Sequence, residues 1–363
     1  MYFKEDRLTD LCVRIFLDCG MSETAARQTA RVLIAADARG IPSHGIARLP
    51  RYVHGLKGGF INPRPQVKIL QDTPVSLNLD ADGSMGAPVS CDVMSGIIAK
   101  AEKSGMALGT VRNSTHFGIA GFYAMMALEH DMIGFAATNT APRGLPTFGG
   151  EARFGTNPLA VAVPAGRQPD FVLDMATTAV TQGKVELYSR LNKPLPDGWA
   201  VNRDGTSATD AAGTLRGFLT GNCFQLPLGG DGEVSGGHKG YGLAVLVDIL
   251  CAVLSGGDFG RRVRIPTGDV SARVSHIFGA VKISSFRDPA SFKTDMDALL
   301  DDLRGTPAAR GQVRVLYAGE KEAEAESRAK SSGIPLDELT YGLLRQIAAD
   351  FHLEQELQNC ILQ

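Results

Sequence analysis

A histidine and an arginine four residues apart are the side chains of this sequence best suited to chemistry. His44 and Arg48 lie in segment 42–52 (PSHGIARLPRY). On a helix this spacing places both side chains on one face. Arginine can hold a carboxylate through two parallel N–H groups, and histidine can exchange a proton with a neighbouring oxygen. Because Pro50 lacks an N–H group, a helix that starts near Ala47 and leaves His44 on a loop is an alternative, as is a solvated Arg48 without a ligand.

Four further groups of polar residues and glycines lie at the ends of short apolar runs, where α/β proteins place ligand contacts. Segment 113–121 (NSTHFGIAG) precedes an expected helix, so its backbone N–H groups could hold a phosphate. Segments 138–140 and 154–158 combine threonine and asparagine, and Asp174 could accept a hydrogen bond from a ribose hydroxyl. Segment 236–242 (GGHKGYG) sets four glycines around a His-Lys pair, a further candidate phosphate site. Each group also fits ordinary turn or helix-cap chemistry.

The apolar pattern predicts the strands and helices that must position these residues. Strands are expected at 75–82, 107–113, 132–139, 158–165, 171–177, 276–283 and 313–319. Helices are expected at 5–19, 22–39, 87–104, 119–130, 239–255, 290–304, 320–331 and 336–352. This mixture predicts an α/β fold with a three-layer mixed-sheet domain over 81–318 and helical regions over 1–80 and 319–363 that pack together. The polar region 186–236 has no assignable elements, so we expect a long excursion there.

Composition and missing motifs exclude several classes of protein. The chain of 363 residues carries 37 Lys and Arg against 39 Asp and Glu, which gives no electrostatic footprint for nucleic acid or for a membrane surface. It lacks an apolar signal-peptide core and a spanning apolar run, and its six cysteines form no CxxC pair, so we expect a cytoplasmic protein with reduced thiols and no metal site. The G-x-G-x-x-G, P-loop and G-x-S-x-G motifs are absent as well.

Six motifs in a fixed order give the sequence a specific resemblance. They are SHGIARLPRY, NSTHFGIAG, FGTNPLAV, DMATT, GGHKGYGLA and LYAGE. The chain resembles, over nearly its whole length, the malate/L-lactate dehydrogenase family, which includes ureidoglycolate dehydrogenase, sulfolactate dehydrogenase, 2,3-diketogulonate reductase and Δ1-piperideine-2-carboxylate reductase. The resemblance implies an oxidoreductase dependent on NAD or NADP, a mixed-sheet cofactor domain without the classical dinucleotide fingerprint, and a homodimer.

The resemblance also implies roles for individual residues. His44, supported by Ser43, is the expected proton donor and acceptor, and His116 is argued to take that role in some members. The expected substrate-binding residues are Arg48, Tyr52 and Thr156. The expected cofactor-binding residues are His116, Phe117, Gly118, Ile119, Ala120, Asp174, Met175, Ala176, His238, Lys239, Gly240, Ala318, Gly319 and Glu320.

Two positions depart from the family pattern. Ala318 stands where a proline often precedes the last Gly-Glu pair, and Lys184 stands where some members carry an acidic residue. The function expected is hydride transfer between a nicotinamide cofactor and a small 2-oxo or 2-hydroxy acid. The alternatives are a reductase of a cyclic imino acid, such as Δ1-piperideine- or pyrroline-2-carboxylate, and a catalytically silent binding protein that keeps the scaffold.

Overall fold

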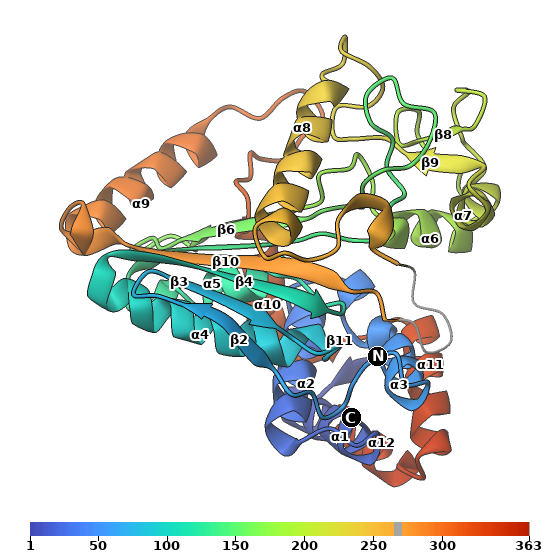
Figure 1. Cartoon of the computed structure of the whole chain (residues 1–363), viewed down its shortest axis with the longest axis horizontal. Helices are drawn as coiled ribbons and strands as arrows, with labels where there is room; N and C mark the ends of the chain where they lie inside the picture. The colour runs from blue at the N-terminus through green and yellow to red at the C-terminus, as the bar shows by residue number, and fades with distance from the viewer. Residues whose placement is uncertain (265–270, 363) are drawn as a thin grey trace.

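A seven-stranded sheet runs through the middle of the computed structural model, which describes residues 1–264 and 271–362 (Figure 1). Its strand order is β2-β3-β4-β10-β5-β6-β7. The strands are β2 (Lys68–Asp72), β3 (Ser76–Asp80), β4 (Met106–Ser114), β5 (Met132–Thr138), β6 (Leu159–Val163), β7 (Phe171–Met175) and β10 (Val274–Lys282). β3 and β4 are parallel, whereas the other neighbouring strands are antiparallel. The expected α/β fold with a mixed sheet is confirmed.

Helices cover both faces of this sheet and make three layers (Figure 1). α4 (Gly86–Ser104) and α5 (Ala120–Met125) pack on one face, and α8 (Gly237–Asp248), continued by a π-helical turn η4 (Ile249–Val253), packs on the other. Side chains of successive residues on the central strand β10 pack on opposite faces of the sheet. Phe278 joins the apolar cluster under α4 and α5, whereas Ile277 packs with Val247 and Cys251 under α8 and η4. The central strand is therefore buried on both sides.

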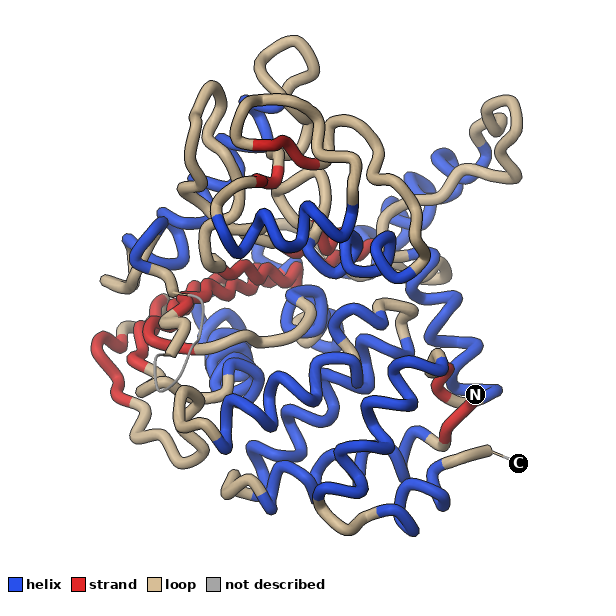
Figure 2. Tube along the Cα trace, turned by 90° about the vertical axis from the view of Figure 1, so that its right-hand side faces the viewer, coloured by secondary structure: helices blue, strands red, loops and turns tan. Residues whose placement is uncertain are grey.

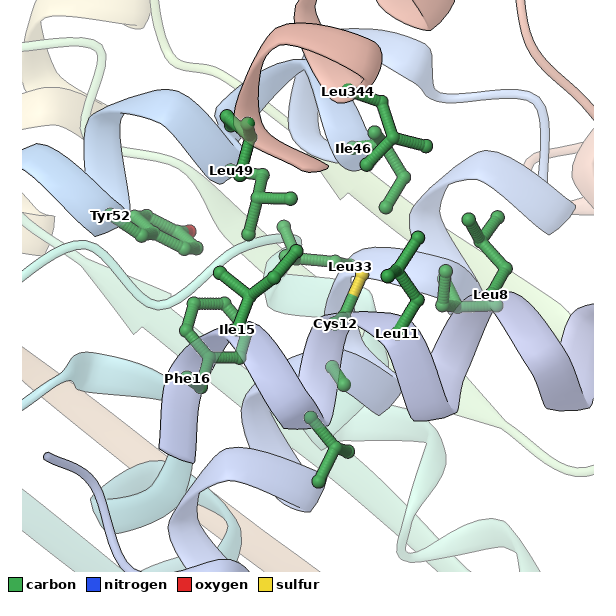
Figure 3. Close-up of a cluster of buried hydrophobic side chains, with 14 of the residues drawn as sticks. Leu8, Leu11, Cys12, Ile15, Phe16, Leu33, Ile46, Leu49, Tyr52 and Leu344 are labelled. Carbon is green, nitrogen blue, oxygen red and sulfur yellow. The ribbon is translucent and has the colours of Figure 1, made fainter. Parts of the chain in front are cut away.

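The two ends of the chain form one helical unit below the sheet, and Figure 2 shows the termini side by side. Its elements are α1 (Glu5–Asp18), α2 (Glu23–Ala38), α3 (Leu49–Lys57), α10 (Glu320–Ser332), α11 (Glu338–Asp350), α12 (Glu354–Cys360) and the paired strands β1 (Tyr2–Phe3) and β11 (Ile334–Pro335). The apolar stripe of α1, including Leu8, Leu11 and Ile15, packs against Leu33 and Leu344 (Figure 3). No helix of the described residues is long and apolar enough to cross a membrane.

The polar excursion folds into a small lobe above the sheet (Figure 1). It contains α6 (Gln182–Arg190), β8 (Ala200–Asn202), α7 (Ala211–Thr220) and β9 (Cys223–Gln225). Val185, Leu195 and Phe218 form a core that belongs to this lobe alone. Its elements are short and are joined by turns, which explains why no long apolar period marks them in the sequence.

Two predicted elements differ from the structure. The strand predicted at 313–319 is wrong: residues 313–316 are mostly exposed, Tyr317 is buried, and a backbone hydrogen bond from Val172 N–H to the carbonyl of Ala318 (3.0 Å) joins the segment to β7 before the chain turns into α10. The helix predicted at 119–130 ends at Met125, and a 3-10 turn, η3 (Leu128–His130), follows. α9 (Pro289–Gly305) agrees with the prediction, and short 3-10 turns lie at η5 (Gly260–Arg262) and η6 (Ile283–Ser285).

Two glycines offer a matched test of this packing. A Cβ at Gly134 of β5 would overlap the carbonyl of Ala124 in α5, whereas a Cβ at Gly342 of α11 meets no atom within 4 Å. We expect Gly134→Ala to lower the free energy of unfolding by about 1–3 kcal/mol. Gly342→Ala should raise it by about 0.5–1 kcal/mol, because alanine loses less backbone freedom in a helix. Urea unfolding of both variants is the measurement, and equal stabilities would contradict the packing.

Candidate active site

The His44–Arg48 segment forms two short turns in front of a helix. η1 (Pro42–His44) and η2 (Ile46–Arg48) are 3-10 turns, and α3 begins at Leu49 with Pro50 in its first turn. Proline is tolerated there because the first N–H groups of a helix have no intrahelical partner. His44 therefore lies before the helix, as the loop alternative predicted, and does not share a helical face with Arg48.

A buried carboxylate holds this segment in place. Oδ2 of Asp37, on α2, accepts a hydrogen bond from Ile46 N–H at 2.7 Å. A Cβ at position 45 would overlap the Asp37 carboxylate, so only glycine fits between His44 and Ile46. Sequence analysis missed Asp37, since nothing in the helical pattern of α2 distinguishes it from a surface residue.

His44 and Arg48 line a cavity of about 300 Å³ with residues from several distant segments. His116 enters from the loop after β4, Thr138 from the end of β5, and Thr156 from the loop before β6. These strand ends were expected to carry ligand contacts, and the structure brings them together. The volume is at the small end for ligand sites and suits a compact molecule.

The two histidines of the cavity face each other. Their rings stack with centroids 5.6 Å apart. Ser43 Oγ lies 2.9 Å from His44 Nδ1. Gly118 N–H donates to His116 Nδ1 (3.2 Å), and the hydroxyl of Tyr52 lies 2.6 Å from the same atom. Because His116 Nδ1 accepts this hydrogen bond from Gly118 N–H, the proton of the neutral ring is assigned to Nε2.

Burial and nearby positive charge keep both imidazoles neutral. Burial, followed by the charges of Arg48 and Arg51, lowers the pKa of His44 to about 4. Burial, Arg51 and His44 hold the pKa of His116 well below its ordinary value. A bound anion would offset the arginines and make protonation of either ring easier.

Tyr52 does not face the cavity. Its side chain is buried among the terminal helices (Figure 3), and its hydroxyl touches the back of His116. The geometry therefore makes Tyr52 a positioning residue for the imidazole.

Several cavity residues were missed by sequence analysis. They are Arg51, His54, Arg143, Gln182, Gln225 and Arg264. Arg51 lies one helical turn after Arg48, a signal that the spacing offered, whereas Arg143 and Gln182 lie in loop-like sequence. Within residues 1–264 and 271–362 no aspartate or glutamate lines the cavity, and no group of metal-ligating side chains occurs.

An acidic residue does approach the cavity from behind Arg48. Lys184 is exposed, but Glu186, two residues later on α6, lies 3.8 Å from Arg48 Nη2 through its Oε2. Gly183 packs against Ser43, and a Cβ there would lie 3.0 Å from that of Ser43. Position 184 therefore carries no acidic side chain, and the acidic residue nearby, Glu186, faces Arg48 rather than His44.

Part of the expected cofactor set lies beside the cavity, at the end of edge strand β7. Gly121 N–H donates to Asp174 Oδ2 at 2.7 Å, which ties the loop from His116 to Ala120 to the strand end. Within that loop Phe117, Gly118, Ile119 and Ala120 are buried, whereas Asp174 is exposed and Met175 and Ala176 are partly exposed. Gly118 has a φ of 86°, a conformation that favours glycine.

The loop at 318–320 packs against the same strand. Gly319 has a φ of 91°, and a Cβ there would lie 2.7 Å from Val172 N. The buried Glu320 turns its Oε1 toward Arg304 Nε (3.2 Å) and Arg314 Nη1 (3.7 Å). Its carboxylate therefore fixes the loop and does not face outward.

The third expected cofactor segment lies apart from the cavity. His238 and Lys239 are exposed in the first turn of α8, on the opposite layer from α4 and α5 (Figure 1). Gly240 is buried, and a Cβ there would overlap the backbone of Leu228. Among the residues that the structure describes, neither His238 nor Lys239 lines the cavity.

The contact between Asp37 and the His44 segment can be tested through pH. Burial raises the pKa of Asp37 from 3.8 to about 8. A carboxyl group whose pKa is raised by folding stabilises the fold fully at pH values below its pKa in the unfolded chain. This contribution is lost as pH rises through its pKa in the folded protein. Asp37→Asn keeps the acceptor for Ile46 N–H and does not titrate. Between about pH 4 and 8 the free energy of unfolding of the wild type should therefore fall relative to that of the variant. Parallel curves from urea unfolding would contradict this.

Known proteins match the chain in both sequence and structure. A family model described as malate/L-lactate dehydrogenase matches residues 3–345. The malate dehydrogenase of Pyrococcus abyssi is 40% identical over 344 residues, covering 95% of this chain and 93% of that protein. The L-sulfolactate dehydrogenase of Methanocaldococcus jannaschii is 35% identical over 358 residues, covering 98% and 99%. The solved structure of malate dehydrogenase from Entamoeba histolytica has a TM-score of 0.93 at 33% identity and covers 97% of this chain and 98% of its own.

Proposed function

Since the chain belongs to the malate/L-lactate dehydrogenase family, an oxidoreductase family acting on hydroxy acids, we propose that it transfers hydride between NAD(P) and a small 2-hydroxy or 2-oxo acid. The observation that carries this proposal is the meeting of two neutral imidazoles with an arginine in one small cavity. A carboxylate beside a carbonyl or hydroxyl group needs this set of partners: a cation for the acid and a proton carrier for the oxygen.

Arg48 is the proposed partner of the substrate carboxylate. Its Nε donates to the carbonyl of Ser43 at 2.5 Å, and Glu186 lies 3.8 Å from Nη2. These contacts hold the guanidinium in one orientation and leave its terminal N–H groups available to a bound anion. Thr156, which lines the same cavity, can contribute a hydroxyl to the substrate.

His44 is the proposed proton carrier. In the oxidation direction the neutral ring accepts the proton of the substrate hydroxyl, and in the reduction direction the imidazolium returns it to the developing alkoxide. Ser43 Oγ, 2.9 Å from Nδ1, orients the ring so that Nε2 is the atom that exchanges the proton. His116, stacked on His44, can donate its Nε2–H to the same substrate oxygen, or take the acid/base role itself.

The residues at the end of β7 fit a dinucleotide. One carboxylate oxygen of Asp174 accepts a hydrogen bond from Gly121 N–H. Because the residue is exposed, its carboxylate can still accept a hydrogen bond from a ribose hydroxyl. The backbone of 116–120 and the loop 318–320 flank it, and His238, Lys239 and Gly240 at the start of α8 are proposed to complete the cofactor site. The nicotinamide, when bound, supplies or accepts the hydride.

Replacement of His44 tests the proton transfer. The wild type is first assayed with NADH and with NADPH on a panel of 2-oxo acids and cyclic imino acids. We expect it to turn over a 2-oxo acid. His44→Asn should lower kcat at least about 100-fold in both directions, since acid/base help is worth about 10²–10⁴-fold. Its affinity for NAD(P)H, followed by fluorescence, should change little. Near-normal turnover in His44→Asn together with loss in His116→Asn would assign the role to His116.

The lowered pKa of His44 predicts the pH profile. Oxidation needs the neutral ring, so kcat/KM for the hydroxy acid should stay level as pH falls and decline only near about pH 4. Reduction needs the imidazolium, so kcat/KM for the 2-oxo acid should rise as pH falls toward the same value. A break in the oxidation profile at the ordinary histidine value of about 6.5 would contradict the environment described for His44.

A homodimer is the proposed working unit. Leu246, Ile249, Val253 and Leu254 form an apolar stripe along α8 and η4, and each is between 46% and 58% exposed. The stripe lies beside β4, where Met106 and Leu108 are exposed as well. An apolar face of this extent is typical of a protein interface, and a second copy of the chain is the partner that the family resemblance implies.

Charge placed in this stripe should separate the subunits. We expect light scattering to give twice the chain mass of 38.5 kDa for the wild type, and one chain mass for the double variant Leu246→Asp, Val253→Asp. Leu219→Asp, which alters an exposed leucine on α7, is the matched control and should leave the mass unchanged. A wild type that scatters as a single chain at micromolar concentration would reject the dimer.

A further inference from the structure

A third histidine is buried in the sheet beside the cavity. His276 lies near the start of β10, and its side chain is 0% exposed. Its backbone pairs with Val111 of β4 on one side and with Thr138 of β5 on the other. Burial lowers the pKa of His276 to about 3, so the ring is neutral. The proposed proton transfer does not use this imidazole.

One ring nitrogen of His276 has a partner and the other has none. Nδ1 lies 2.7 Å from the hydroxyl oxygen of Thr138, which lines the cavity. The Thr138 hydroxyl donates to the carbonyl of Asn139 (3.0 Å) or of Ser275 (3.1 Å), so its oxygen accepts and Nδ1 is assigned the proton. Nε2 is buried, and within residues 1–264 and 271–362 it has no hydrogen-bond partner. Because such an atom is unfavourable, stability alone would favour an apolar side chain at position 276.

The ring of His276 lies flat on that of Phe117. The two centroids are 4.6 Å apart, and the ring planes differ by 5°. Phe117 also stacks on Tyr123 of α5, with centroids 4.9 Å apart, and the Tyr123 hydroxyl donates to the carbonyl of Phe117. Two rings, one from the sheet and one from α5, therefore hold the Phe117 side chain, which is 1% exposed.

The stack on Phe117 extends to the two histidines of the cavity. Phe117 directly follows His116, so a contact that fixes Phe117 also fixes the loop that carries His116. The His116 ring in turn stacks on that of His44, with centroids 5.6 Å apart. Within the described part of the chain, His276 itself does not line the cavity. Its influence on the reaction therefore passes through Phe117 and Thr138.

We propose that His276 is a positioning residue for proton transfer: its stack on Phe117 sets the position of His116 beside His44. The contact from Nδ1 to Thr138 fixes the plane of the His276 ring. A histidine suits both tasks, because it combines a flat ring with a donor at the ring edge, and the unpaired Nε2 is the cost of that combination. This inference rests on the proposed function and names a further residue that the function needs.

Three replacements of His276 separate the stack from the hydrogen bond. His276→Phe keeps a flat ring, His276→Asn keeps a donor near the position of Nδ1, and His276→Leu fills similar space without a flat ring. Each is assayed at saturating NADH or NADPH with a 2-oxo acid that the wild type turns over. We expect kcat to fall about tenfold or more in His276→Asn and His276→Leu, because a small misplacement of a reacting group can lower the rate about 100-fold.

His276→Phe should restore the function of the ring. We expect its kcat to stay within about threefold of the wild-type value, since the stacked pair is kept. The KM for the acid should change less than about twofold in all three variants, because Arg48 is held by other contacts and the loss falls on the chemical step. His276→Leu preserves the test if His276→Asn does not fold, because leucine is apolar and close to histidine in size.

A neighbouring residue of β10 provides the matched control. Ile277 is 1% exposed and packs on the opposite face of the sheet, so Ile277→Ala should lower stability in urea and leave kcat unchanged. An equal fall of kcat in Ile277→Ala and His276→Leu would assign the loss to a loosened strand and overturn the inference. Phe117→Leu combined with His276→Leu should be little slower than either single variant, because both remove one contact, and additive losses would also overturn it.

The outcomes separate this inference from the proposed function. A wild type that turns over no acid with either cofactor would reject the proposed function, and this inference with it. Wild-type turnover with equal kcat in His276→Phe and His276→Leu would reject only the role of the stack. Normal kcat in His276→Asn with a fall in His276→Phe would assign the effect to the contact with Thr138 and overturn the inference as well.

Discussion

The pairing of β10 between β4 and β5 is the constraint on which the site depends. β10 comes more than 130 residues after β5 in the chain, yet it is hydrogen-bonded to both strands and closes the sheet between them. Its first residue, Val274, pairs with Ser114 at the end of β4, and His276 pairs with Thr138 at the end of β5. The antiparallel register therefore brings the start of one strand to the ends of two others. The cavity opens at this point, with His116 and Thr138 in its wall.

A second constraint is electrostatic. The cavity gathers arginines around two imidazoles, and the carboxylate of Glu186 stands behind Arg48. Burial, together with the nearby positive charge, lowers the pKa of His44 and His116 and keeps both rings neutral. An anionic substrate changes that balance as it binds, since it offsets the arginines next to His44. Under the proposed function, substrate binding and proton transfer are thereby coupled, because a bound anion raises the basicity of the rings.

Local patterns in the sequence predicted six of the seven sheet strands, the longer helices and the motif residues, whereas β2, the short helices of the lobe and the long-range contacts lay beyond them. The 3.6-residue apolar period of α1 and the short apolar runs of β5 and β6 are visible in sequence, as is the His44 motif. Arg143 was not found because its partners Gln182 and Gln225 lie far away in the chain. Asp37 was not found because the helical pattern of α2 does not show that its carboxyl group meets the turn at Ile46. The strand predicted at 313–319 failed although edge strand β7 lies beside it, because after the hydrogen bond from Val172 N–H to the carbonyl of Ala318 the chain turns into α10 instead of running along β7.

The residues that line the cavity come from different parts of the fold. His44, Arg48 and His116 are fixed by the terminal helices and by the sheet, where Asp37 and Tyr52 hold them from behind. Gln182 comes from the lobe over 182–225, which has its own small core and contacts the cavity only at its edge. The lobe also touches the His44 segment, because Gly183 packs against Ser43 and Glu186 approaches Arg48. A change in the core of the lobe is therefore expected to move Gln182 together with the groups behind Ser43 and Arg48, so the two sides of the cavity respond as one unit.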